Sequence, residues 1–140
     1  MKINLLYRKK TFQLNGILFK VFKELNYGFR EKVYQYAISL ELKRNKISFI
    51  REVYIPIFYM GRKISRYYID FLIDNKIALE IKVADRFYQS HVSQLLSYLK
   101  SANLKLGILA IVTPKGIRIK RFANTKKGLP PNSSRNTQNN

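Results

Sequence analysis

The run from Ile77 to Val83 constrains the fold more than any other segment. It reads IALEIKV, so apolar side chains occur on both faces of a strand whose alternate residues point to opposite sides. A strand that is apolar on both faces is typical of the middle of a sheet. The two charged side chains of the run, Glu80 and Lys82, lie two residues apart and share one face. The pattern predicts a central strand that also carries one charged pair.

The segments around this strand switch between helical and strand periodicity. Apolar residues recur at helical spacing from Leu14 to Leu25 and from about Phe29 to Asn45. β-Branched and aromatic residues then become frequent, and Gly and Asn mark tight turns, which predicts an α/β fold. The expected strands are residues 47–59, 64–73, 77–83, 106–112 and 117–122, and a third helix is expected over about 89–102.

The length of 140 residues allows one hydrophobic core and is too short for two domains of comparable size. We expect a single domain over residues 1–123. After Ala123 the sequence NTKKGLPPNSSRNTQNN contains a single leucine among polar residues, Gly and Pro. This segment cannot bury enough apolar surface to offset the entropy of ordering, so residues 124–140 are predicted to be a disordered tail.

The charge balance is strongly basic, with 27 Lys and Arg against eight Asp and Glu, and a formal net charge of +19. Each carboxylate on a protein that binds a polyanion repels phosphate, so the shortage of acids favours nucleic acid as the partner. Ribosomal and membrane-surface proteins share this composition. No run approaches the roughly 18 to 20 apolar residues of a membrane span, and polar residues interrupt the N-terminal segment where a signal peptide would be apolar. We expect a cytoplasmic protein with no membrane partner.

Two of the few acidic residues fall on neighbouring predicted strands. The short turn Asp74–Lys76 makes the strand that contains Asp70 an antiparallel neighbour of the strand that contains Glu80. Regular alternation would place Asp70 on one face with Tyr68 and Leu72. Two carboxylates that converge among apolar strands repel each other and are costly to desolvate unless a cation lies between them. An exposed cross-strand ion pair is the alternative for the same pattern.

The residue types limit which cation such a site would bind. The chain has no cysteine and one histidine, His91, so thiolate sites are excluded and a zinc site is disfavoured. Oxygen ligands from Asp70 and Glu80 favour Mg²⁺ or Mn²⁺, with the Ile81 carbonyl and waters completing the shell. Lys82, beside the metal, is expected to orient or deprotonate a water that attacks a phosphodiester.

Two predicted helices contribute further polar side chains. Glu31 lies one turn before Tyr34 on a partly apolar helix face, so it is expected to point inward and help to hold the metal, although the helix dipole also favours an acid in the first turn. Gln94 and Tyr98 share a face of the later helix, where core packing is the alternative role for Tyr98. The side chains expected to contact nucleic acid are Tyr98, His91, Arg66 and Arg86. For each of the two arginines, the alternative is a solvated position on the surface.

The run from Gly28 to Tyr34, GFREKVY, matches the pattern that names the GxxExxY proteins, a branch of the PD-(D/E)XK nuclease superfamily. The resemblance covers about residues 11–122. The chain departs from that family in lacking Gly-Pro-Gly before the motif and Asn-Phe after a late strand. The other segments that carry the resemblance are Tyr68-Ile69-Asp70, Glu80-Ile81-Lys82, His91-x-x-Gln94-Leu95-Leu96-x-Tyr98-Leu99 and Leu106-Gly107-Ile108-Leu109.

The resemblance implies a fold and a set of roles. It implies a restriction-endonuclease-like core, in which a mixed central β-sheet is flanked by helices. It also implies that Glu31, Asp70 and Glu80 are acidic metal ligands or their supports. Lys82 would be the catalytic lysine, and Gln94 with Tyr98 would form an exonuclease-like helix motif.

The sequence therefore predicts a DNA nuclease that depends on Mg²⁺ or Mn²⁺. One alternative is a Holliday-junction resolvase-like endonuclease, which has the same Asp and Glu-x-Lys chemistry but acts as a homodimer; Gln94-x-x-x-Tyr98 argues against it. The other is a non-catalytic nucleic-acid-binding accessory protein with the nuclease fold, against which the retention of the acidic residues and Lys82 argues. RNA is an alternative substrate.

Overall fold

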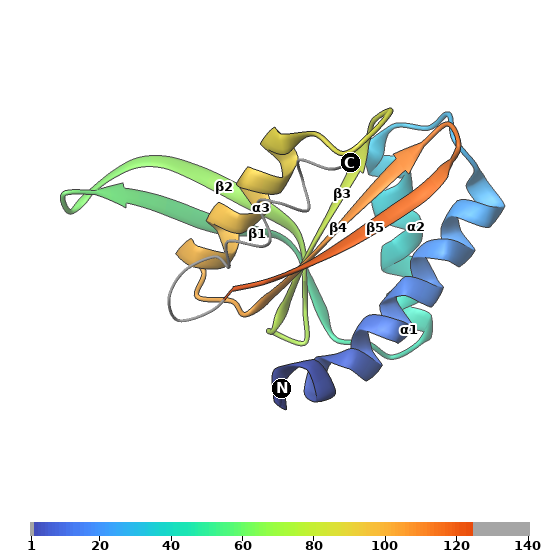
Figure 1. Cartoon of the computed structure of the whole chain (residues 1–140), viewed down its shortest axis with the longest axis horizontal. Helices are drawn as coiled ribbons and strands as arrows, with labels where there is room; N and C mark the ends of the chain where they lie inside the picture. Colours follow the sequence, from blue (N-terminus) through green and yellow to red (C-terminus); the bar gives the residue numbers. More distant parts are fainter. Residues whose placement is uncertain (1, 125–140) are drawn as a thin grey trace.

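The computed structural model describes residues 2–124, which form a five-stranded sheet flanked by three helices (Figure 1). The central strand is β3 (Ile77–Val83), as its apolar pattern predicts. It pairs antiparallel with β2 (Arg62–Ile73) and parallel with β4 (Leu106–Thr113). β1 (Phe49–Tyr59) and β5 (Gly116–Ala123) form the two edges. The predicted α/β architecture with a mixed central sheet is confirmed.

The helices cover the two faces of the sheet. α3 (Gln89–Ser101) is the crossover that two adjacent parallel strands require, here β3 and β4. α1 (Lys2–Leu25) and α2 (Glu31–Arg44) pack on the opposite face. α1 begins well before the predicted start at Leu14, because the Lys, Leu, Arg and Gln residues that precede it favour a helix even without an apolar stripe.

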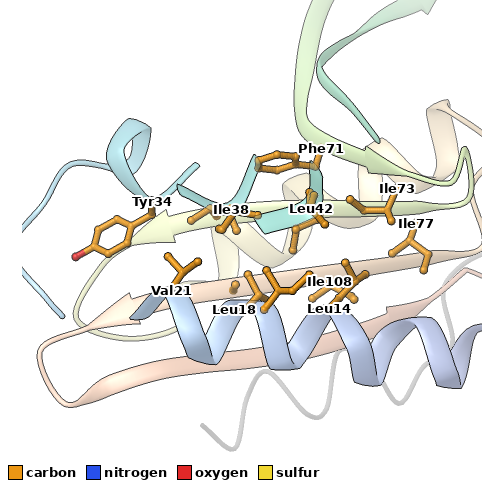
Figure 2. Packing of buried hydrophobic residues seen from close by; sticks show 14 of the residues in the cluster. Leu14, Leu18, Val21, Tyr34, Ile38, Leu42, Phe71, Ile73, Ile77 and Ile108 are labelled. Carbon is orange, nitrogen blue, oxygen red and sulfur yellow. The ribbon is translucent and has the colours of Figure 1, made fainter. Parts of the chain in front are cut away.

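Two apolar layers hold the helices to the sheet. In the first layer, Leu14, Leu18 and Val21 of α1 point toward α2 and the strands (Figure 2). Tyr34 lies at one end of this layer, and its hydroxyl points away from the other labelled side chains. The second layer lies under α3. Its buried residues are Ile55, Ile69, Ala78, Val92, Leu95, Leu96, Tyr98, Leu99, Leu109, Ile111 and Phe122.

The end of the described chain is fixed to the end of α3. The Asn124 side-chain amide donates hydrogen bonds to the carbonyls of Leu99 (3.3 Å) and Leu104 (3.0 Å). The first residue of the predicted tail is therefore held in place, and residues 125–140 lie outside the described part of the chain. Within residues 2–124, no helix is long and apolar enough to cross a membrane.

Candidate active site

The site lies where β2 and β3 separate. Their backbone ladder ends at the pair Phe71 and Leu79, and the next pair in register is Asp70 and Glu80. At this pair, the side-chain carboxylates accept the hydrogen bonds that backbone carbonyls accept in the rest of the ladder. The Asp70 N–H donates to Glu80 Oε1 at 3.0 Å, and the Ile81 N–H donates to Asp70 Oδ2 at 2.8 Å. The predicted antiparallel pairing thus does bring the two acidic side chains together.

The regular alternation of β2 breaks at Asp70. Ile69 packs in the layer under α3, whereas Phe71 packs in the layer under α1 and α2. In an undistorted strand these two side chains would share a face. The β1–β2 ladder also skips the opposing position, Glu52, whose φ of +52° is unusual for a residue other than glycine. The expectation that Tyr68, Asp70 and Leu72 share one face is therefore wrong, because the twist at this point turns the strand over.

Burial dominates the electrostatics of the acidic pair. Glu80 is only 3% exposed. Burial, and then the charge of Asp70, raise the pKa of Glu80 to about 8. Burial likewise raises the pKa of Asp70. Two such groups cannot both ionise cheaply, so the pair retains a proton near neutral pH unless a cation neutralises it.

Lys82 lies beside the acidic pair, and His91 lies near Lys82 and Glu31. The positive charge of Lys82 acts on both carboxyl groups and favours their ionised forms. Burial, and then the charge of Lys82, lower the pKa of His91, so this imidazole is neutral at pH 7. The His91 ring packs edge-on against Tyr88 at 5.6 Å, and its buried Nδ1 has no hydrogen-bond partner.

Glu31 reaches the same end of β3 from α2. It is the first residue of that helix, and its Oε2 accepts a hydrogen bond from the Val83 N–H at 3.2 Å. The turn before it is fixed by Gly28, whose φ of +130° disfavours other residues, and by the Tyr34 hydroxyl, which donates to the Asn26 carbonyl. The three named positions of the Gly28-x-x-Glu31-x-x-Tyr34 run thus cooperate to direct one carboxylate toward the site.

α3 contributes a buried phenol. Tyr98 is 6% exposed, and burial followed by the charge of Glu80 raises its pKa. Its ring lies 4.6 Å from that of Tyr67, a contact that the sequence analysis did not predict. The only signal for Tyr67 was its position three residues before Asp70. Gln94 lies one turn before Tyr98 on α3 and is exposed.

The two predicted arginine contacts lie on different segments. Arg66 is exposed on β2, opposite Pro56 of β1. Arg86 is exposed in the loop between β3 and α3, and its guanidinium lies 5.0 Å from the centre of the Tyr88 ring.

The donor atoms at this site suit a hard divalent cation only in part. No cluster of three or more His, Asp or Glu side chains arranged for a metal ion occurs within residues 2–124. Asp70 and Glu80 supply two adjacent carboxyl groups, the donor type that Mg²⁺ and Mn²⁺ prefer. Glu31 bonds to the Val83 N–H nearby. Any remaining ligands would have to be backbone carbonyls, such as that of Ile81, and water.

The sequence model of the PD-(D/E)XK nuclease superfamily matches residues 8–120, which is most of the chain. The chain belongs to that superfamily. Its narrower resemblance to the GxxExxY branch rests on the motif residues. No curated protein sequence matches the chain significantly.

Solved structures support the same fold. The crystal structure of SSO0001 superposes with a TM-score of 0.51 and 22% sequence identity. The match covers 76% of this chain and 54% of that chain, so this protein corresponds to about half of the length of SSO0001. At this level of identity the likeness shows the fold.

Proposed function

We propose that this protein is a metal-dependent DNA nuclease that hydrolyses phosphodiester bonds. The observation that carries the proposal is the buried pair Asp70 and Glu80, with Lys82 beside it, in a member of a nuclease superfamily. A purely structural pair of this kind is unfavourable, because burial raises the pKa of both groups and the charge of Asp70 raises that of Glu80 further. A site that binds a cation explains why both are present.

Asp70 and Glu80 would hold Mg²⁺ or Mn²⁺, together with the Ile81 carbonyl and waters. The bound cation would neutralise the carboxylates and supply a Lewis acid for the phosphate. Glu31 supports the site from α2, either directly or through a water, since it is held at the end of β3 by the Val83 N–H.

The other side chains position the reactants. The Lys82 ammonium shares a strand face with Glu80 and orients or deprotonates the attacking water. Gln94 lies one turn from Tyr98 on α3, and the pair acts as the exonuclease-like helix motif that positions the substrate strand. We assign the chain to the GxxExxY branch on the joint roles of Gly28, Glu31 and Tyr34.

The charge favours nucleic acid as the partner, and we propose DNA. A net charge of +19 attracts phosphate and concentrates the polyanion at the surface. His91, Arg66 and Arg86 are the proposed nucleic-acid contacts, whereas the buried ring of Tyr98 packs in the layer under α3. The absence of cysteine from the sequence fits a cytoplasmic location.

The test is cleavage of labelled duplex, single-stranded and branched DNA with Mg²⁺, Mn²⁺ or chelator. Lys82→Ala is expected to lower the rate about 100-fold or more while leaving the fold intact. Asp70→Asn is expected to abolish cleavage, and it keeps a side-chain oxygen that can accept the hydrogen bond from the Ile81 N–H.

Two results would contradict the proposal. Cleavage that is unchanged in both variants would place the activity elsewhere or in a contaminant. If the wild type cleaves none of the substrates, a non-catalytic nucleic-acid-binding role becomes the better account.

A further inference from the structure

The β1–β2 hairpin extends well beyond the rest of the sheet (Figure 1). β2 pairs with β3 only from Phe71 onward. Its earlier residues pair with β1 alone, as far as the pair Tyr59 and Arg62 next to the turn. We refer to residues 53–69 as the arm. A two-stranded ribbon is marginally stable alone, and one face of this ribbon is anchored by apolar contacts in the layer under α3. The anchoring residues are Val53, Ile55, Ile57, Tyr67 and Ile69.

The other face of the arm presents aromatic rings to solvent. Tyr54 and Tyr68 are directly opposite each other, with ring centres 5.7 Å apart, and are 44% and 50% exposed. Further toward the tip, Phe58 is 61% exposed. Clustered exposed apolar groups on a soluble domain indicate an interaction surface. The exposed large apolar residues of the arm are Tyr54, Phe58, Tyr59, Met60, Ile64 and Tyr68.

The positive charge of the arm indicates which kind of partner it binds. Residues 53–69 contain Arg62, Lys63 and Arg66 and no acidic residue. The Lys63 ammonium donates to the Tyr54 hydroxyl at 3.1 Å and lies 5.7 Å from the centre of its ring. Rings interleaved with cations complement a polyanion that has flat apolar groups, and a nucleic-acid strand has both features.

The arm begins at the proposed active site. Tyr68 precedes Asp70 by two residues, a distance of about 7 Å along an extended strand. A DNA strand held at Asp70 and Glu80 would therefore lie within reach of the arm, which presents the Tyr54 and Tyr68 rings on its face away from α3. Within a duplex the base faces are already stacked on one another, so only unpaired bases can stack on protein rings.

We propose that the arm binds unpaired bases of the substrate, so that the enzyme acts on DNA with a single-stranded segment at the cleavage site. Tyr54 and Tyr68 stack on bases, and Lys63 and Arg66 contact the adjoining phosphates. The inference rests on the proposed nuclease function, because that function places DNA at Asp70 and Glu80.

The test is binding of the full-length protein to labelled oligothymidine and to a blunt duplex of equal length, measured by fluorescence anisotropy in chelator. Stacking on a ring changes affinity by about fivefold to a hundredfold per base. Tyr54→Ala/Tyr68→Ala should lower affinity for oligothymidine by about tenfold or more, and affinity for duplex by less than about twofold. Tyr54→Phe/Tyr68→Phe should retain single-strand affinity, because the rings remain.

A matched control removes exposed rings elsewhere. Phe12 on α1 and Tyr36 on α2 are 81% and 60% exposed, and Phe12→Ala/Tyr36→Ala should leave both affinities unchanged. Circular dichroism and a thermal melt check folding. If the Tyr54→Ala/Tyr68→Ala protein is unfolded, Phe58→Ala at the exposed part of the arm replaces it. Loss of this one ring should lower the affinity for oligothymidine by about fivefold or more and leave the affinity for duplex unchanged.

Three outcomes would overturn the proposal: unchanged affinity for oligothymidine, an equal loss for duplex, or a shift in oligomeric state with single-strand affinity intact. The last would identify the arm as a contact between copies of the chain. Because the binding experiment is done in chelator, its results do not depend on cleavage of the DNA. Loss of activity in Lys82→Ala with normal binding would leave the nuclease proposal standing even if the arm had failed its test.

Discussion

The carboxylates of Asp70 and Glu80 themselves terminate the β2–β3 ladder. Backbone N–H groups that lose a strand partner must find another acceptor when they are buried. Asp70 accepts the hydrogen bond of the Ile81 N–H, and Glu80 accepts that of the Asp70 N–H. The same two side chains thus stabilise the separation of the strands and form the proposed metal site. Removing the Asp70 acceptor would leave a buried donor unpaired, at a cost of about 1–3 kcal/mol.

The raised pKa of Glu80 predicts how stability depends on pH in the metal-free protein. The folded state keeps a proton up to about pH 8, whereas an unfolded glutamate loses it near its ordinary value of 4.5. Since the folded state binds more protons across this range, the free energy of unfolding should fall as pH rises from about 5 to 8, by at most about 1.4 kcal/mol per pH unit. Urea denaturation in chelator at several pH values measures this slope.

Glu80→Gln should flatten that slope, because glutamine does not titrate. Added Mg²⁺ should stabilise the wild type more at pH 8 than at pH 6, since ionised carboxylates bind the cation. The variant should lose most of this response. A wild-type stability that rises between pH 5 and 8 in chelator would show that the burial of Glu80 is not the dominant effect.

At the scale of elements, α3 is held against β4 by a close approach at Gly107. A Cβ at this position would lie 3.0 Å from Leu95 Cδ1 and 3.1 Å from Leu99 Cδ1. Both leucines are fully buried, so neither can move freely. The glycine therefore sets the depth at which α3, and with it Tyr98, sits on the sheet.

Gly107→Ala is expected to lower the free energy of unfolding by about 1–3 kcal/mol, because the added methyl group overpacks the contact. Gly16→Ala is the matched control. Gly16 lies within α1 with no atom within 4 Å of a Cβ built on it, so alanine there should raise stability by about 0.5–1 kcal/mol. Urea denaturation of both variants measures the two effects. A neutral or stabilising Gly107→Ala would mean that the leucines repack.

At the scale of the whole molecule, the excess of positive charge predicts strongly salt-dependent binding to DNA. Log K should fall linearly with log salt, by about 0.9 per phosphate contacted on duplex and about 0.7 on single strands. Arg66→Gln on the arm should reduce the slope for single strands by about one phosphate contact. Lys9→Gln, which removes the same charge from the exposed surface of α1, should leave the slope nearly unchanged. A flat salt response would remove nucleic acid as the partner.

Much of the site could be predicted from sequence, because it depends on local rules. The two-residue period of a strand places Glu80 and Lys82 on one face, and the short turn at Asp74 sets the register that brings Asp70 opposite Glu80. The motif from Gly28 to Tyr34 predicts Glu31 as a site residue, and its carboxylate accepts a hydrogen bond from the Val83 N–H. The roles of these residues in catalysis remain predictions.

The sequence by itself determined the order and type of the elements and the central place of β3, because periodicity reports which faces of a segment are buried. Only the tertiary structure decided the break at Asp70 and Glu52, the contact between Tyr67 and Tyr98, and the projection of the arm. These features depend on how opposite faces of the β1–β2 hairpin pack, with Ile69 under α3 and Phe71 under α1 and α2. No local pattern within the hairpin encodes that packing, since the three helices belong to other segments of the chain.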